Sequence, residues 1–158
     1  LFPYRRSSDL WGGISMRLEK SLVLIKPDAV ERNLIGKILE VYEGAGLKIK
    51  AMEMKQINKE FAEKHYEEHR DKQFFNSLIK YITRSPLVAL ILEGEDAINK
   101  IRSLNGATNP EKAEFGTIRR RFALSGTENS VHASDSIESA EKEIKLWFPK
   151  VFYEEICG

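Results

Sequence analysis

The sequence lacks the features that mark several specialised classes of protein. Its one cysteine, Cys157, cannot form an internal disulfide, which favours a reducing compartment. No apolar run approaches the roughly 18 residues that a membrane-spanning helix needs. The 25 basic and 24 acidic residues leave a net charge of only +1, so bulk electrostatics gives no reason to expect a nucleic-acid partner. These absences predict a cytoplasmic protein with neither a membrane nor a specific nucleic acid as its partner.

At 158 residues the chain has the size of one domain, and its 42% hydrophobic and 31% charged residues are typical of a globular protein. The first segment, LFPYRRSSDLWGGIS, does not match the register of the residues after it. Its Arg5-Arg6 pair resembles part of a twin-arginine export signal, but no apolar segment follows the pair. We therefore predict that residues 1–15 are an extra N-terminal segment outside the fold and that residues 16–158 form the domain.

Hydrophobic periodicity predicts four strands and five helices. Strands are expected at SLVLIK (21–26), LKIKAMEM (47–54) and LVALILE (87–93), and around 129–133. Helical spacing predicts helices at 35–47, where Gly44 and Gly46 end the helix, and at 59–69, 73–83, 95–104 and about 136–147. Without the extra helices the order is βαββαβ. This order predicts an α+β fold, a ferredoxin-like βαββαβ sandwich with extra helices.

The stretch from about 105 to 128 has no sustained periodicity. Connections of this length are uncommon in compact domains unless they are functional. It contains Thr108, Thr117 and the run Arg119-Arg120-Arg121, whose hydroxyls and cations suit an anion. We therefore predict a long active-site loop that binds an anion here.

The segment NSVHASDS (129–136) places His132 between the last strand and the last helix. An unperturbed imidazole is mostly neutral at pH 7, and one ring nitrogen can attack if the other donates to a fixed acceptor. Strand alternation puts Val131 and His132 on opposite faces. Asp135 is expected to cap the helix, with Glu138 as its capping-box partner.

The last helix supplies candidate acceptors for that second nitrogen. Its buried stripe is expected to be Ile137, Ala140, Ile144, Trp147 and Phe148. Glu138 falls outside the stripe, whereas Glu141 and Glu143 lie on its two flanks, and the helical wheel does not choose between them. From spacing alone, a solvated histidine followed by an ordinary surface helix is the simpler interpretation.

Several blocks together resemble one enzyme family. NSVHASDSIESAEKEI resembles the active-site signature of the nucleoside diphosphate kinases. SLVLIKPDAVERNLIG, KHYEEHRDKQFF, SPLVALILEG, GATNP and GTIRRRF resemble further family blocks in the family's order, over about residues 19–149. The resemblance implies transfer of the terminal phosphoryl group from a nucleoside triphosphate such as ATP to a nucleoside diphosphate, through a phosphohistidine in a ping-pong reaction. It also implies Mg²⁺, carried in by the nucleotide phosphates.

The resemblance gives catalytic roles to matching residues. His132 would be the nucleophile that becomes phosphorylated. Glu143 would hold its other ring nitrogen, and Ser134 would support that carboxylate. Tyr66 would lie beside the histidine, and Lys26 would serve both catalysis and nucleotide binding.

The resemblance also implies a nucleotide site. Phe74 would stack on the base, and Asn129 with Lys26 would reach the sugar hydroxyls. Cations and a hydroxyl would surround the phosphates, where transfer spreads negative charge: Lys26, Arg102, Thr108 and Arg119. Arg119 can fork onto two phosphate oxygens.

Plainer interpretations exist for some of these residues. A lysine at a strand end, such as Lys26, more often extends into water. Phe74 beside Phe75 is more often a core pair than a base platform. His65 and His69 are four apart, which allows a metal pair, but no third protein ligand is evident, so a solvated helix face is the expected setting.

The chain departs from the family pattern at three places. Ala133 follows the histidine where glycine is usual. Arg120 and Arg121 stand where small or acidic residues are common; they either strengthen phosphate attraction or pair with nearby glutamates. The chain ends soon after Trp147-Phe148, which leaves a homo-oligomer expected but open between tetramer and hexamer.

The competing class, a nucleic-acid-binding or regulatory module, would need exposed aromatics on the central strands, and SLVLIK and LVALILE have none.

Overall fold

The computed structural model describes residues 4–5 and 17–157 of the chain. At its centre is an antiparallel sheet in the order β5-β2-β4-β3. Its strands are β2 (Arg17–Ile25), β3 (Lys48–Lys55), β4 (Leu87–Glu95) and β5 (Val131–Ala133). Each coincides with a predicted strand to within a few residues. A two-residue strand, β1 (Tyr4–Arg5), pairs with the start of β2.

β1 belongs to the segment that the sequence predicts to be outside the fold. Tyr4 and Arg5 pair with Leu18 and Arg17. Residues 6–16, and with them the predicted domain boundary, lie outside the described residues. The division of the chain at residue 15 therefore stays a prediction.

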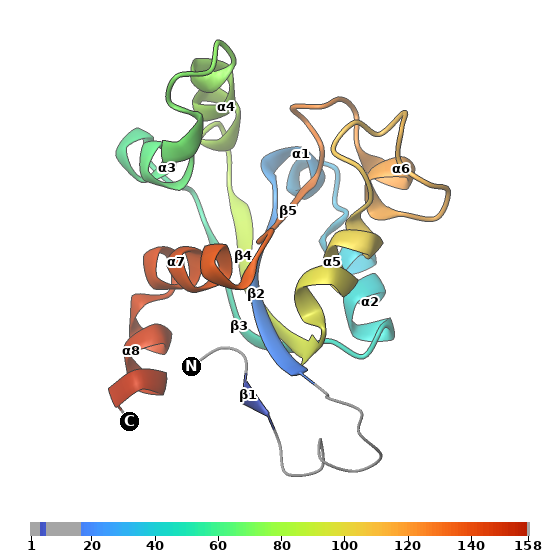
Figure 1. The fold of residues 1–158 in the computed structure, drawn as a ribbon. Coiled ribbons are helices and arrows are strands. Elements are labelled where there is room, and N and C mark those ends of the chain that lie inside the picture. Colours follow the sequence, from blue (N-terminus) through green and yellow to red (C-terminus); the bar gives the residue numbers. More distant parts are fainter. Residues whose placement is uncertain (1–3, 6–16, 158) are drawn as a thin grey trace.

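The helices account for the rest of the architecture (Figure 1). They are α1 (Pro27–Glu31), α2 (Ile35–Gly44), α3 (Lys59–His65), the 3-10 helix η2 (Glu67–His69), α4 (Phe75–Ile82), α5 (Ala97–Asn105), α6 (Ile118–Phe122), α7 (Ile137–Trp147) and α8 (Pro149–Cys157). Every predicted helix is present. The helices α1, α6 and α8 were not predicted from the sequence. α1 and α6 have five residues each, too few to show a helical period, whereas α8 has nine. The order β2-α2-β3-β4-α5-β5 confirms the predicted ferredoxin-like fold.

Helices cover both faces of the central strands. On one face Val23 and Leu90 pack with residues of α2 and α5. On the other, Leu22 and Ile91 pack with residues of α3, α4 and α7, and Figure 1 shows these two helix layers on opposite sides of the sheet. Burying one such aliphatic side chain stabilises the fold by roughly 1.5–3 kcal/mol. A nucleic-acid-binding module of the competing class would need an open face on β2 and β4. Neither of these strands has one.

Strand pairing brings distant segments together at one end of the sheet. Pro27 begins α1 directly after β2, and the backbone N–H of Lys26 donates to Ser130 O at 2.8 Å. Two residues earlier on β2, Leu24 pairs with His132 of β5. Lys26 and the His132 segment, about a hundred positions apart in the sequence, therefore lie side by side.

The start of α7 differs from the prediction by one residue. Ser136 is the N-cap, and its Oγ accepts the backbone N–H of Ser139 at 3.0 Å. The prediction that Asp135 caps this helix is wrong. Both residues are good caps, and the extended backbone at Ser136 decides between them.

Candidate active site

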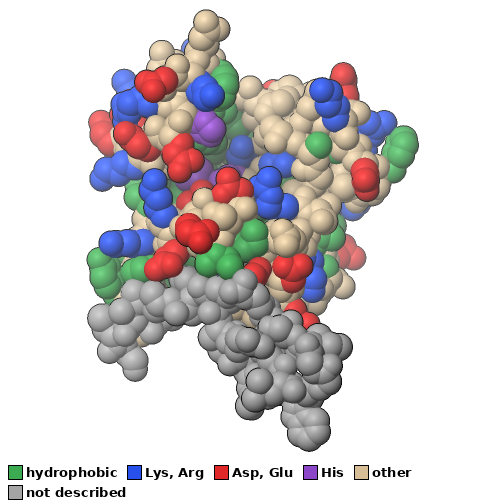
Figure 2. All heavy atoms as spheres, in the orientation of Figure 1, with side chains coloured by type: hydrophobic (Ala, Val, Ile, Leu, Met, Phe, Trp, Pro, Cys, Tyr) green, Lys and Arg blue, Asp and Glu red, His purple; other side chains and the backbone are tan. Residues whose placement is uncertain are grey.

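A single cavity of about 1030 Å³ brings the predicted site residues together. One wall is the arm formed by α3, η2 and α4 (residues 59–82, the α3–α4 arm), and the opposite wall consists of α5, α6 and the loop that follows each. β5 and α7 lie between these walls. Figure 2 shows this hollow with histidine side chains inside it and lysines and arginines around it. The predicted residues lining it are Lys26, Tyr66, Phe74, Arg102, Thr108, Arg119, Asn129, His132 and Glu143.

His132 lies in the middle of β5 and faces the cavity. Val131 beside it is fully buried on the opposite face, which confirms the predicted alternation. The His132 side chain is 20% exposed, and its Nε2 lies 3.1 Å from Glu143 Oε1. A carboxylate accepts only, so Nε2 carries the proton in this pair and Nδ1 has the lone pair.

Glu143 is held from behind by the residue predicted to support it. Ser134 is fully buried behind the cavity wall, and its Oγ donates to Glu143 Oε1 at 2.6 Å. The backbone N–H of Leu22 donates to the same Oγ at 3.1 Å, which fixes the serine to β2. The helical wheel left Glu141 and Glu143 equivalent, and the placement of α7 against β5 selects Glu143.

The solvated-face interpretation of His65 and His69 is wrong. Both line the cavity, and His65 ends α3 whereas His69 lies in η2. The His65 ring packs edge-on against His132, with centroids 4.8 Å apart, and its Nδ1 accepts Trp147 Nε1–H at 3.1 Å. Burial, and then the neighbouring His132, lower the pKa of His65 well below its usual value. A neutral histidine thus backs His132.

Two polar atoms of the arm are buried without a hydrogen-bond partner. They are the hydroxyl of Tyr66 and Nδ1 of His69. Burial first, and then the charge of Glu143, raise the pKa of Tyr66, so its hydroxyl keeps its proton. Since buried polar groups are normally paired, both atoms are open to a polar ligand in the cavity. The sequence offered His69 only as a possible metal ligand with His65, and gave it no place in the nucleotide site.

Lys26 does not extend into water as a strand-end lysine commonly does. It is 5% exposed, and its Nζ donates to Asn129 Oδ1 at 2.9 Å. The Asn129 amide in turn donates to Gly126 O at 3.1 Å. Burial, and then the charge of Arg119, lower the pKa of Lys26 to about 7, while Asp28 raises it. The predicted Lys26–Asn129 pair is therefore assembled at the cavity wall.

Arg119 ties three parts of the backbone together. Its guanidinium donates to Gly106 O at 2.8 Å, Val131 O at 2.7 Å and Asn129 O at 3.3 Å. Three of its five N–H groups are thereby used, and one on each terminal nitrogen remains. Burial first lowers its pKa, although a guanidinium stays charged. Arg119 is thus both a brace of the loops and a cation at the cavity.

The remaining phosphate-site candidates are at the cavity mouth. Arg102 in the last turn of α5 and Thr108 in the following loop are both exposed and line the cavity. Arg120 and Arg121 are directed elsewhere. Arg120 stacks on Phe115 and donates to the backbone carbonyl of Glu111, so it makes neither predicted type of contact.

Phe74 and Phe75 are not a core pair. Phe75 is 7% exposed and belongs to the core, whereas Phe74 is 48% exposed and lines the cavity. The centroid of the Phe74 ring lies 5.9 Å from the centroid of the His69 ring. An open aromatic face at a cavity wall is the setting that base stacking needs.

The described part of the chain offers neither a metal cluster nor a membrane-spanning helix. Among residues 4–5 and 17–157, no group of three or more His, Cys, Asp or Glu side chains is placed to hold a metal ion. None of the helices within the same residues combines the length and the apolar composition that crossing a bilayer requires.

Comparison with known proteins gives one consistent result. The family model described as nucleoside diphosphate kinase matches residues 19–152. A nucleoside diphosphate kinase of Clostridium perfringens is 99% identical over 143 residues, 90% of this chain and 100% of the relative. One from Methanothermobacter thermautotrophicus is 53% identical over 141 residues, 89% of this chain and 92% of the relative.

Solved structures agree with these sequence matches. The Aquifex aeolicus nucleoside diphosphate kinase has a TM-score of 0.82 and 39% identity, covering 85% of this chain and 97% of its own. The Halobacterium salinarum nucleoside diphosphate kinase in complex with CDP also has a TM-score of 0.82, with 40% identity. The match covers 84% of this chain and 89% of the Halobacterium chain.

Proposed function

Because this chain belongs to the nucleoside diphosphate kinase family, we propose that His132 Nδ1 is the atom that carries the phosphoryl group between nucleotides. The reaction of the family is the transfer of the terminal phosphoryl group from a nucleoside triphosphate to a nucleoside diphosphate. The observation that carries the proposal is the chain of contacts from Ser134 through Glu143 to His132 Nε2. It holds the imidazole with Nδ1 free.

In the first half-reaction the Nδ1 lone pair attacks the γ-phosphorus of the donor. The bond from this phosphorus to the β–γ bridging oxygen breaks, and the nucleoside diphosphate leaves. The Nε2 proton stays in place, because Glu143 stabilises the positive charge that develops on the ring. In the second half, a terminal oxygen of the acceptor diphosphate attacks the phosphohistidine, and Nδ1 is the leaving group.

The other cavity residues provide binding and charge stabilisation in this proposal. Arg102, Arg119 and Thr108 contact the phosphates, and the unpaired Tyr66 hydroxyl is a further donor near the nucleophile. Phosphoryl transfer needs positioning and charge stabilisation more than covalent chemistry from the protein, which suits such a set. Lys26 contributes to both phosphate and sugar contacts.

Base and sugar contacts extend the proposed site beyond the phosphates. Phe74 stacks on the base, and Asn129 with Lys26 reaches the sugar hydroxyls. Every base has a π-face, so a single aromatic platform accepts purines and pyrimidines alike. The Halobacterium salinarum relative was solved with CDP, a pyrimidine nucleotide. The substrates proposed here are accordingly nucleoside tri- and diphosphates with any common base.

We propose Mg²⁺ as the cofactor, held by nucleotide phosphates and water. The donor set fits this arrangement, since the cavity offers cations and hydroxyls to phosphate, and the described residues contain no cluster of metal-binding side chains. Bound to the phosphates, the ion supplies neutralisation of their charge. No side chain of this chain is assigned to it.

The proposal extends to the assembly and its location. A homo-oligomer, either tetramer or hexamer, is supported by β3, which pairs only with β4 among the described residues and exposes Met52 and Met54. A cytoplasmic location is supported by the single cysteine of the sequence.

The proposal is tested by phosphorylating the protein with ATP in the absence of an acceptor. The first half of a ping-pong reaction needs only the donor, so the wild-type protein should become labelled. A phosphate on nitrogen is labile in acid and stable in alkali, unlike phosphoserine. Adding GDP should release the label as GTP. His132→Ala should abolish labelling and turnover yet still bind nucleotide.

The chain has three histidines, and all three line the cavity, so matched variants are needed. His65→Gln and His69→Gln should each retain an acid-labile label, because neither carries it. A wild-type protein without such a label, or a His132→Ala variant that keeps its turnover, would falsify the proposal. If the label disappears only in His65→Gln or only in His69→Gln, the histidine replaced in that variant is the nucleophile.

A further inference from the structure

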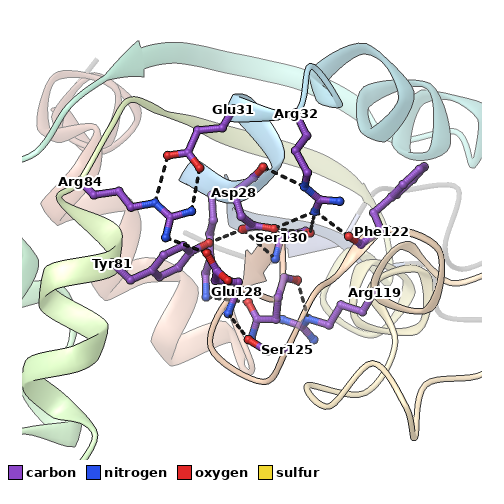
Figure 3. Close-up of polar contacts among 12 residues, drawn as sticks. Asp28, Glu31, Arg32, Tyr81, Arg84, Arg119, Phe122, Ser125, Glu128 and Ser130 are labelled. Atoms are coloured by element: carbon purple, nitrogen blue, oxygen red, sulfur yellow. Dashed lines mark hydrogen bonds and ion pairs between the residues drawn. The ribbon is translucent and has the colours of Figure 1, made fainter.

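Asp28 is a buried carboxylate outside the cavity that accepts hydrogen bonds from three different parts of the chain (Figure 3). It lies in α1 and is 1% exposed. The Tyr81 hydroxyl from α4 donates to Oδ1, and the Arg32 guanidinium donates to Oδ2 at 3.1 Å. Ser130 donates twice, through its backbone N–H at 3.2 Å and through Oγ at 2.8 Å. A buried charge of this kind is retained only where its partners are held in place.

Ser130 occupies a backbone conformation that needs support. Its φ is +69°, in the left-handed region that non-glycine residues rarely adopt. The two bonds to Asp28 hold both its backbone and its side chain. Figure 3 shows Ser130 between Asp28 on one side and Arg119 on the other. The carboxylate therefore stabilises the bend by which the loop becomes β5.

This bend lies between the sugar contact and the nucleophile. Asn129, which precedes it, accepts from Lys26 Nζ at 2.9 Å. Val131, which follows it, begins β5, and His132 is the next residue. The Ser130 carbonyl also accepts the backbone N–H of Lys26 at 2.8 Å. A rotation at Ser130 would thus move both ends of the nucleotide site relative to each other.

We propose that Asp28 is a positioning residue for phosphoryl transfer, which fixes the nucleophile strand and the sugar-binding loop through Ser130. It does not touch the nucleotide, since it lies behind the cavity wall. The inference rests on the proposed role of His132 and concerns what places that ring. Reacting atoms must be held closely, and a misplacement of about 1 Å can cost on the order of a hundredfold in rate.

The test compares rates with stability in variants along this contact. Asp28→Asn keeps the shape and removes the charge, and Ser130→Ala removes the Oγ anchor. Ser130→Gly also removes the anchor, but glycine adopts positive φ without strain, so folding stability is retained while placement is lost. We expect the rate of phosphoprotein formation at saturating ATP to fall by about tenfold or more in all three. The rate is measured by rapid quench well below each variant's Tm.

A double variant and a stability control complete the design. Asp28→Asn combined with Ser130→Ala should be no slower than Asp28→Asn alone, because both changes break one linkage. Ile38→Ala, in α2 and outside the cavity lining, lowers Tm through core packing and should leave the rate unchanged. If Asp28→Asn does not fold, the rate of phosphoprotein formation in Ser130→Gly decides whether the proposal holds. Wild-type rates in Ser130→Gly, or multiplicative losses in the double variant, overturn the proposal.

Failure of the proposed function has a different signature. Steady-state transfer from ATP to GDP is measured in the same variants, and it does not depend on detecting the intermediate. Absence of an acid-labile label in the wild type rejects the phosphohistidine. Loss of steady-state transfer in Ser130→Gly at unchanged Tm still supports positioning by Asp28, and unchanged transfer still rejects it.

Discussion

The ring of His132 is fixed at one nitrogen and free at the other. Its Nε2 faces Glu143, whose carboxylate also accepts from Ser134, and Ser134 is attached to the backbone of β2. His65 packs against the ring on another side at 4.8 Å. At the scale of single residues, the proposed nucleophile is thus held in one orientation by its neighbours, as phosphoryl transfer would require.

Lys26 gives the clearest pH dependence of the site. In the free protein its pKa is lowered to about 7, first by burial and then by Arg119. A bound polyphosphate favours the charged ammonium and raises this pKa again. Above pH 7 the free lysine is mostly neutral, so binding must take up a proton. Affinity for ADP should therefore weaken with rising pH between about pH 7.5 and 9, by up to about tenfold per unit.

Calorimetry in two buffers of different ionisation enthalpy measures this proton uptake directly. Wild-type protein should take up close to one proton per ADP at about pH 8. Lys26→Met should bind more weakly and show no uptake from this residue. Equal binding heats for the wild type in both buffers would contradict the lowered pKa of Lys26.

At the scale of elements, the α3–α4 arm is a separate wall with its own attachment. Its inner side packs into the core through Phe75 and Ile79, whereas Phe74 faces the cavity. At the end of α4, Arg84 bonds both Glu31 of α1 and Glu128 of the opposite loop, each at 2.7 Å. These exposed ion pairs contribute modestly to stability. They nevertheless connect the two walls between which the nucleotide is proposed to bind.

The arm's contribution to binding is tested at its base platform. Phe74→Ala should weaken ADP and CDP binding together, by about 1–3 kcal/mol for lost base stacking. Because Phe74 is 48% exposed, the Tm should change little. Phe115→Ala is the matched control, since Phe115 is 86% exposed and does not line the cavity. A loss confined to one base would mean that hydrogen-bonding edges are recognised instead.

At the scale of the whole molecule, attraction for nucleotides is local. The net charge is +1, so no overall field concentrates anions on the protein. The cations are instead placed around one cavity by segments from β2 to α7. The sheet also has an exposed border at β3, where Met52 and Met54 are each 55% exposed. An unpaired strand edge can pair with another chain, and exposed apolar side chains beside it can add to such a contact.

The proposed oligomer is checked by its mass in solution. Light scattering coupled to size exclusion should give four or six times the 18.1 kDa of one chain, at micromolar protein and physiological salt. Since obligate oligomers bury apolar surface, the mass should not depend on concentration over this range. A mass of one chain under these conditions would reject the homo-oligomer.

The sequence by itself determined most of the elements, their order and nine of the residues that line the cavity. Hydrophobic period is a local property, so LVALILE and the helix after SDS could be assigned without the fold. The family blocks then identified His132, Phe74 and Asn129 for the cavity. Very short helices such as α1 gave no period and were missed.

Only the tertiary structure decided contacts between segments that are distant in sequence. It placed Glu143 against His132, a choice that the family resemblance implies and the helical wheel leaves open. It also buried Lys26 and turned His65 and His69 into the cavity. It also revealed the carboxylate of Asp28 under Ser130, a contact over 102 positions that no local pattern records. The physical reason is that a helical wheel gives the face of a side chain, whereas its partner depends on how that face packs against the sheet.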